Sequence, residues 1–221
     1  MQLSELFYSV QGEGPAVGRP AIFVRMSSCN LNCVGCDTPI RNKVEETEPI
    51  SVINRIKNYL KTYPNSRIVI TGGEPLLQPD AVNQIIDGIP GQMVDLETNG
   101  TIQDQKALIS RFNIVVVSPK KNTFPTLLDS TKFFKDWMDI SNSGRNNVFF
   151  KVVMGNLPWA WSESEIREVL NRSGVPTSRV WLMPAGENET KLHVSGKNTW
   201  KIAMRLGCNY SDRLHIRCSG K

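Results

Sequence analysis

The chain has 221 residues, with 26 Lys and Arg against 21 Asp and Glu, and a net charge of +5. It contains no run of about 18 apolar residues and begins with the polar stretch MQLSELFYSVQGEG, so we expect neither a membrane span nor a signal peptide. The mild positive charge gives no reason to expect nucleic-acid binding, and a chain of this length can bury a core without disulfide bonds.

Predicted strands and helices alternate along the chain. Apolar runs predict strands at 21–27, 67–71, 93–97, 113–118, 147–154 and 179–184, and a short last strand at 213–218. Helical spacing of apolar residues predicts helices at 50–63, 79–89, 103–112, 162–172 and 198–207. The helix at 162–172 begins with the capping-box pair Ser162 and Glu165. Segment 121–146 matches no motif.

This alternation favours an α/β fold with parallel strands, in one domain over 1–221. A complete eightfold barrel typically needs about 250 residues, more than this chain has. About six main strands therefore indicate a partial, open barrel or a doubly wound sheet.

Polar or glycine-rich motifs follow five of the predicted strands. These are the cysteine loop after 21–27, GGEP (72–75), TNG (98–100), PKK (119–121) and PAGENE (184–189). In parallel α/β folds, ligands bind at the carboxyl ends of the strands. We therefore expect these motifs to form the binding site.

The most specific motif is CNLNCVGCDT, which places Cys29, Cys33 and Cys36 within eight residues. An odd total of five cysteines favours metal binding in a reducing cytoplasm over disulfides. Zinc is one alternative, with His193 or His215 as a distant fourth ligand, but the C-x3-C-x2-C spacing is unusual for zinc. A [4Fe–4S] cluster held by three thiolates would leave one iron without a protein ligand, and that iron could bind a cofactor.

The C-x3-C-x2-C spacing resembles the radical S-adenosylmethionine (SAM) superfamily, whose open iron binds SAM. The resemblance implies reductive cleavage of SAM to a 5′-deoxyadenosyl radical, on a partial, open (β/α)6-type barrel with reduced helical decoration. TGGEP (71–75), SPK (118–120) and MPAG (183–186) are similar to SAM-binding motifs of that superfamily.

One family within it matches over nearly the whole chain. The stretches YSVQGEGPAVGRPAIFVR (8–25), CDT (36–38), TGGEP, ETNG (97–100), SPK and RLHI (213–216) resemble 7-carboxy-7-deazaguanine synthase. That family converts 6-carboxy-5,6,7,8-tetrahydropterin to 7-carboxy-7-deazaguanine, on the route to queuosine and other deazapurines. Its members use Mg²⁺ and form homodimers, and the resemblance implies a small pterin substrate, an electron donor such as flavodoxin and a cytoplasmic location.

The resemblance also assigns roles to individual residues. Cys29, Cys33 and Cys36 would hold the cluster, and Thr38 would ligate Mg²⁺. The implied SAM contacts are Gly35, Cys36, Asp37, Gly73, Glu74, Ser118, Pro119, Lys120, Met183, Pro184, Ala185 and Gly186. The implied substrate contacts are Val10, Gln11, Gly12, Glu13, Arg25, Thr71, Glu97 and His215. A strand-end salt bridge is the lesser alternative for Arg25, and without the resemblance His215 would be expected to be a buried core histidine.

Two other functions stay open. An activase that generates a glycyl radical on a protein partner would share the cysteine spacing, but it gives no reason for QGEG (11–14) or RLHI. A ferredoxin-type electron carrier would normally complete its cluster with a fourth cysteine. Cys208 and Cys218 are expected to be structural thiols.

Overall fold

The computed structural model describes residues 1–34, 36, 44–144 and 147–219. By its internal contacts the chain forms two compact units. Unit 1 comprises Met1–Val10, Arg19–Asn32 and Cys36–Val115, and unit 2 comprises Gln11–Gly18, Cys33–Gly35 and Val116–Lys221. That the two form one domain stays a prediction.

Unit 1 is an open mixed sheet with helices on one side. Its elements are β1 (Gln2–Val10), β2 (Pro20–Met26), β3 (Glu45–Glu46), α1 (Pro49–Thr62), β4 (Arg67–Gly72), η2 (Pro75–Leu77), α2 (Pro79–Gly88), β5 (Val94–Thr98) and α3 (Lys106–Ile109). The strand order is β3-β1-β2-β4-β5. The pairs β2–β4 and β4–β5 are parallel, whereas β1 is antiparallel to both β2 and β3.

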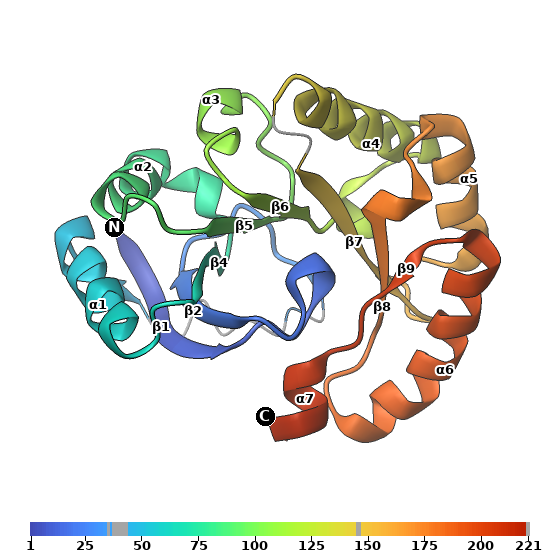
Figure 1. The fold of residues 1–221 in the computed structure, drawn as a ribbon. Helices are drawn as coiled ribbons and strands as arrows, with labels where there is room; N and C mark the ends of the chain where they lie inside the picture. The colour runs from blue at the N-terminus through green and yellow to red at the C-terminus, as the bar shows by residue number, and fades with distance from the viewer. Residues whose placement is uncertain (35, 37–43, 145–146, 220–221) are drawn as a thin grey trace. The chain divides into compact units, whose positions relative to one another are not determined.

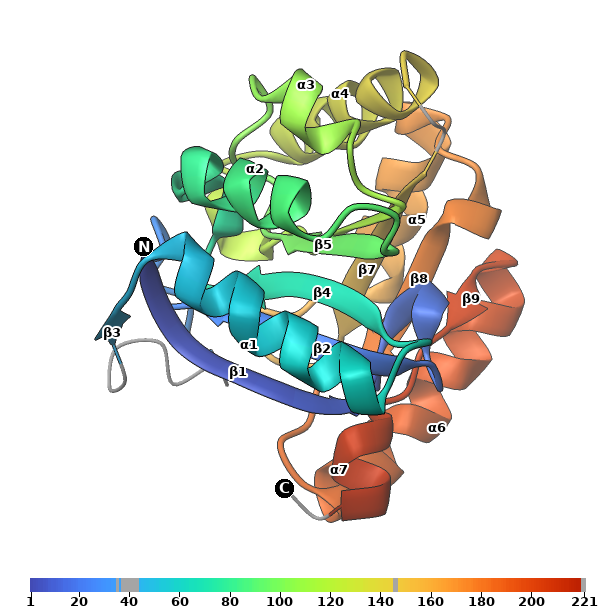
Figure 2. The same cartoon turned by 60° about the vertical axis from the view of Figure 1, so that its left-hand side comes forward.

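β2 and β4 of unit 1 are apolar because consecutive residues, which point to opposite faces of the sheet, are buried in both strands. In Figure 1, α1 and α2 lie outside the strands, and in Figure 2 α1 lies in front of the sheet between β1 and β4, with α2 next to β5. On one face of the sheet Ala21, Phe23 and Val69 form a buried cluster, and Phe7 stacks on Phe23 with ring centroids 5.0 Å apart. Such continuous apolar runs are typical of parallel strands buried on both faces.

Unit 2 repeats the pattern of a parallel sheet covered by helices. Its elements are η1 (Gly14–Ala16), η3 (Lys121–Thr123), α4 (Leu127–Asn142), β7 (Val148–Met154), α5 (Glu163–Ser173), η4 (Thr177–Arg179), β8 (Val180–Pro184), α6 (Glu189–Leu206), β9 (Asn209–Tyr210) and α7 (Leu214–Ser219). β7, β8 and β9 are parallel neighbours, and α4, α5 and α6 lie outside them (Figure 1). β6 (Ile114–Val117) contains the boundary between the units.

The predicted open α/β architecture is confirmed. The strand order runs β3-β1-β2-β4-β5-β6-β7-β8-β9, so over the described residues the sheet ends at β3 and β9 and is not closed. None of the described helices is both long enough and apolar enough to cross a membrane.

The fold differs from or adds to the sequence prediction in four details. The first strand, β1, has nine residues and was not recognised in the sequence, and its antiparallel pairing with β2 makes the sheet mixed. Segment 121–146 contains α4, whose capping box is formed by Thr126 and Asp129. Helix α6 begins at Glu189, nine residues before the predicted start. Residues 213–218 lie largely in α7, because Asp212 accepts hydrogen bonds from the backbone N–H and the side chain of arginines in this turn.

Candidate active site

In unit 1, the cysteine loop leaves the carboxyl end of β2. The sulfur of Cys29 accepts a hydrogen bond from the backbone N–H of Leu31 at 3.4 Å and a weaker one from Asn99 Nδ2 at 4.0 Å. The same amide of Asn99 donates to Asn30 Oδ1 at 3.1 Å, which fixes its orientation. The contact with Asn99 holds the sulfur of Cys29 beside the turn that follows β5.

The GGEP turn after β4 packs directly on the cysteine loop. The backbone N–H of Gly73 donates to Met26 O at 2.9 Å, and that of Glu74 donates to Ser28 O at 2.7 Å. A Cβ atom on Gly73 would overlap the carbonyl of Ser28 and lie 2.9 Å from Cys29 Cβ. A side chain is therefore excluded at Gly73 by the cysteine loop itself.

The carboxylate of Glu74 joins the ends of β4 and β5. Glu74 is fully buried. It accepts hydrogen bonds from the backbone N–H groups of Leu76 and Asn99 at 3.0 and 2.8 Å, and from the hydroxyl of Thr98. A buried carboxylate with this many donors has a structural role, because its hydrogen bonds connect the turn after β4 to the end of β5. Its predicted role in receiving the SAM amino group stays a prediction.

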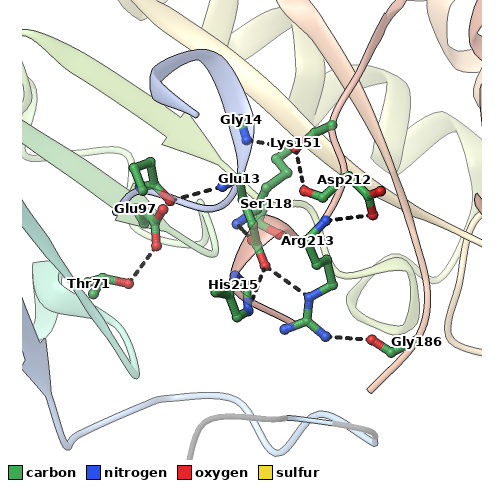
Figure 3. Close-up of polar contacts among 12 residues, drawn as sticks. Glu13, Gly14, Thr71, Glu97, Ser118, Lys151, Gly186, Asp212, Arg213 and His215 are labelled. Atoms are coloured by element: carbon green, nitrogen blue, oxygen red, sulfur yellow. Dashed lines mark hydrogen bonds and ion pairs between the residues drawn. The ribbon is translucent and has the colours of Figure 1, made fainter. Parts of the chain in front are cut away.

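Three predicted substrate residues lie at the carboxyl ends of neighbouring strands of unit 1. Arg25 of β2 is opposite Thr71 of β4. The Thr71 hydroxyl donates to Glu97 of β5 at 2.8 Å, as Figure 3 shows. Arg25 forms an ion pair with Glu5 at 3.4 Å, the strand-end salt bridge that its sequence position also allowed. The fourth predicted substrate residue in this unit, Val10, ends β1 and is 45% exposed.

In unit 2, Glu13 is surrounded by positive charge (Figure 3). Its carboxylate pairs with Lys151 Nζ at 2.5 Å and Arg213 Nε at 3.0 Å, and His215 Nε2 lies 3.9 Å away. The side chain is only 12% exposed. Burial alone raises the pKa of the Glu13 carboxyl, but the charges of Lys151 and Arg213 outweigh that effect and lower the pKa from 4.5 to about 2. Glu13 is therefore an ionised hydrogen-bond acceptor at neutral pH.

The QGEG and RLHI motifs contact each other. Leu214 N donates to Gly12 O at 3.0 Å. A Cβ atom on Gly12 would overlap the ring of His215 and lie 3.1 Å from its backbone nitrogen. His215 is 37% exposed and so is not a core histidine. Gln11 is buried, and its side-chain oxygen accepts from Glu13 N at 3.1 Å.

The two remaining SAM motifs also lie in unit 2. Lys120 Nζ donates to Ser118 Oγ at 2.9 Å, and Trp161 Nε1 donates to Pro119 O at 3.3 Å. Met183 and Pro184 end β8 and are buried, as is Ala185, whose N–H donates to Met154 O at 2.9 Å. Gly186 O accepts from Arg213 Nη1 at 2.7 Å. These contacts are within the protein, and the predicted SAM-binding roles of the two segments stay predictions.

The cysteines present thiols that suit an iron–sulfur cluster. Gly35, Asp37 and Thr38 lie outside the described residues. All five cysteines are thiols, and in the described part of the chain no three His, Cys, Asp or Glu side chains are gathered around one metal position. Metal sites are rarely preformed without their metal. The five thiols and the donors to Cys29 fit an iron–sulfur cluster.

Sequence reasoning missed Lys151, Arg213 and Asn99. Lys151 had a signal, because it is the one charged residue in the apolar run NVFFKVVM. Arg213 stood at the start of RLHI, but its partner Glu13 is 200 residues away. Asn99 belonged to ETNG, and only the fold shows that its amide reaches a cysteine loop 70 residues earlier.

Comparisons with known proteins identify the family. Residues 23–127 match the model of the radical SAM superfamily. The chain is 32% identical to 7-carboxy-7-deazaguanine synthase of Hyperthermus butylicus, over 98% of this chain and 92% of that protein. The synthase of Halobacterium salinarum is 31% identical, over 98% and 89%.

A solved structure shows the same fold. The crystal structure of QueE from Escherichia coli has a TM-score of 0.56 and 18% identity to this chain, and the match covers 97% of this chain and 94% of that one. At this identity the likeness concerns the fold alone. Because the match to the curated relatives extends over nearly the whole chain at more than 30% identity, the chain belongs to the 7-carboxy-7-deazaguanine synthase family of the radical SAM superfamily.

Proposed function

We propose that this protein converts 6-carboxy-5,6,7,8-tetrahydropterin to 7-carboxy-7-deazaguanine in deazapurine biosynthesis. The observation that carries the proposal is the identity to synthases of that name along almost the entire chain. The contact between QGEG and RLHI supports it, since both motifs are built into one cluster around Glu13. A glycyl-radical activase is not favoured, because it would give no use to that cluster.

Cys29, Cys33 and Cys36 would hold a [4Fe–4S] cluster, and SAM would bind beside it. When bound, these groups supply the radical that removes a hydrogen atom from the substrate, while the protein binds and orients both molecules. The expected SAM contacts come from the turn at Gly73 and from segments 118–120 and 183–186. Gly73 supports this placement because it touches the cysteine loop.

The pterin would be recognised by carboxylates. A pterin edge presents N–H groups, and an ionised carboxylate can accept two of them. Glu13 fits this role because its low pKa keeps it charged. Glu97 would act similarly, with Thr71 holding one of its oxygens. Arg25 would bind the substrate carboxylate with its planar guanidinium. The substrate carboxylate would then share this guanidinium with Glu5, its ion-pair partner in the structure.

Mg²⁺ is proposed to bind at Thr38, two residues after the last cluster cysteine. The hydroxyl of Thr38 and the carboxylate of its sequence neighbour Asp37 would offer two oxygen ligands of the kind that Mg²⁺ prefers. Water and substrate would supply the rest of about six ligands. Thr38→Val keeps the shape and removes the oxygen. The turnover rate of this variant should depend less on Mg²⁺ concentration than that of the wild type, and its cluster should stay intact. Superimposable curves of rate against Mg²⁺ concentration would place the metal elsewhere.

The reaction also implies partners. We expect a low-potential electron donor such as flavodoxin, a homodimer, and a location in the cytoplasm, where the product would feed queuosine synthesis. The family supports these expectations, and the mildly basic chain, with a pI near 9.0, suits an acidic electron carrier.

The decisive experiment is anaerobic turnover of the reconstituted protein with SAM and 6-carboxy-5,6,7,8-tetrahydropterin. Mass spectrometry should find 7-carboxy-7-deazaguanine together with methionine and 5′-deoxyadenosine. Cleavage of SAM that leaves the pterin unchanged would reject this substrate and keep the radical chemistry.

A further inference from the structure

Arg213 is the side chain that connects the proposed substrate segment to the proposed SAM segment. Its Nε donates to Glu13 Oε1 at 3.0 Å, and its Nη1 donates to Gly186 O at 2.7 Å (Figure 3). The side chain is 12% exposed. One buried guanidinium therefore holds a carboxylate of the 11–14 segment and a backbone carbonyl of the 183–186 segment at the same time.

The backbone on both sides of Arg213 is anchored to the same two regions. Gly14 N donates to Ser211 Oγ at 2.8 Å, and Leu214 N donates to Gly12 O at 3.0 Å. Ser211 N donates to Leu182 O of β8 at 3.0 Å. Because one guanidinium holds both groups, we expect a shift of Glu13 to be transmitted through Arg213 to the contact with Gly186.

We propose that Arg213 couples the binding of pterin to the binding of SAM. This inference rests on the proposed function, in which Glu13 accepts N–H groups of the pterin and the 183–186 segment lines the SAM site. A pterin that binds to Glu13 restrains the carboxylate further, and through Arg213 it also restrains the carbonyl of Gly186. SAM then binds to a segment whose motion is already reduced, so each ligand strengthens the binding of the other.

Arginine is suited to this role by its shape. Its planar guanidinium presents donors in a rigid fork, so the contacts to Glu13 and Gly186 are fixed relative to each other. Lysine would keep the positive charge beside Glu13 but could not hold both acceptors in a fixed geometry. Arg213→Lys therefore separates coupling from charge, because Lys151 and the new lysine still keep Glu13 ionised.

Arg217 provides a matched control in the same turn. Its Nε donates to Asp212 Oδ2 and its Nη2 donates to Leu192 O, both at 3.0 Å. It thus forms the same kind of fork, from a carboxylate to a backbone carbonyl. Neither of these two acceptors lies in the 11–14 or the 183–186 segment, so Arg217→Lys should leave the coupling unchanged.

The test is equilibrium binding to the reconstituted protein with its cluster oxidised, so that SAM is not cleaved. SAM affinity is measured with and without saturating 6-carboxy-5,6,7,8-tetrahydropterin, and pterin affinity with and without SAM. In wild type we expect each ligand to raise the affinity for the other by about fivefold or more, and by the same factor in both directions. In Arg213→Lys the factor should fall toward one, and in Arg217→Lys it should match the wild type.

Each other outcome is decisive. A factor of one in wild type, with both ligands bound, would overturn the coupling and leave the proposed function standing. A wild-type factor in Arg213→Lys would show that the arginine does not carry it. Failure of wild type to bind the pterin would overturn the proposed function and this inference with it. Cluster absorbance and thermal unfolding show whether Arg213→Lys is folded, and if it is not, Arg213→Gln replaces it, with Lys151 as the remaining cation beside Glu13.

Discussion

Glu13 shows how burial and charge together decide the state of one side chain. Removing one partner of a buried ion pair leaves an uncompensated charge, which typically costs about 3–5 kcal/mol. In Glu13→Gln, Lys151 and Arg213 would lose the carboxylate that neutralises them. We therefore expect Glu13→Gln to lower the free energy of unfolding by about 3 kcal/mol at pH 7.

The pH dependence of this difference has a definite sign. The folded pKa of Glu13 is lowered to about 2 from 4.5, so its stabilisation is fully present above pH 4.5 and is lost as the pH falls toward 2. Urea unfolding of metal-free wild type and variant at pH 7, 4 and 3 should show a shrinking difference. Glu187→Gln is the control, because Glu187 pairs with Lys191 on the surface. Equal effects of the two substitutions at every pH would contradict the role of burial.

Cys33 and Cys208 differ in chemistry although both are thiols. Cys33 lies in the loop assigned to the cluster, whereas burial raises the pKa of Cys208 to about 11, so Cys208 stays protonated and is a poor metal ligand. We expect Cys33→Ala to abolish the [4Fe–4S] absorbance and all SAM cleavage, and Cys208→Ala to retain both. A full cluster in Cys33→Ala, measured by iron and sulfide content, would remove Cys33 from the ligand set.

The turn after β4 packs so closely on the cysteine loop that a substitution at Gly73 tests whether this contact positions the loop. A methyl group on Gly73 would overlap Ser28 O, so the substitution must push the cysteine loop away. Overpacking of this kind typically costs about 1–3 kcal/mol, and we expect Gly73→Ala to lose stability by that amount and to bind less cluster.

Gly144→Ala is the matched control for that substitution. A Cβ atom on Gly144 would lie 3.6 Å from Ile140 O, an ordinary contact, so cluster content and stability should stay at the wild-type level. The measurements are iron content and thermal unfolding. A normal cluster in Gly73→Ala would show that the loop can move without consequence, and would leave only a direct role toward SAM for this glycine.

Elements with a strong internal pattern could be predicted from the sequence, and those shaped by their neighbours could not. The capping box of Ser162 and Glu165 begins α5 as expected, because the signal is local. β1 was missed because its apolar residues pack on β2, which the sequence alone does not show. The 213–218 segment alternates like a strand, but the side chain of Asp212 favours a helical turn there.

At the scale of the whole molecule, the motifs predicted which residues matter but not how they are joined. Strand-end positions placed Gly73 and Glu74 near the cysteine loop correctly, because parallel strands bring their carboxyl ends to one edge. The cation cluster around Glu13 could not be predicted, since Lys151 and Arg213 come from a strand and a loop far away in sequence. Such contacts are properties of the tertiary fold and have no local signal.

The three-cysteine motif makes a prediction about the whole reconstituted protein. A [4Fe–4S] cluster held by only three thiolates keeps one iron available to an added ligand, whereas four cysteines would leave none. We therefore expect SAM to change the electron paramagnetic resonance spectrum of the reduced protein. Adenosine, which lacks the amino and carboxylate groups of SAM, is the control and should leave the spectrum unaltered. Identical spectra with and without SAM would mean that a fourth protein ligand occupies the iron, and the chain would then resemble an electron carrier more than a radical enzyme.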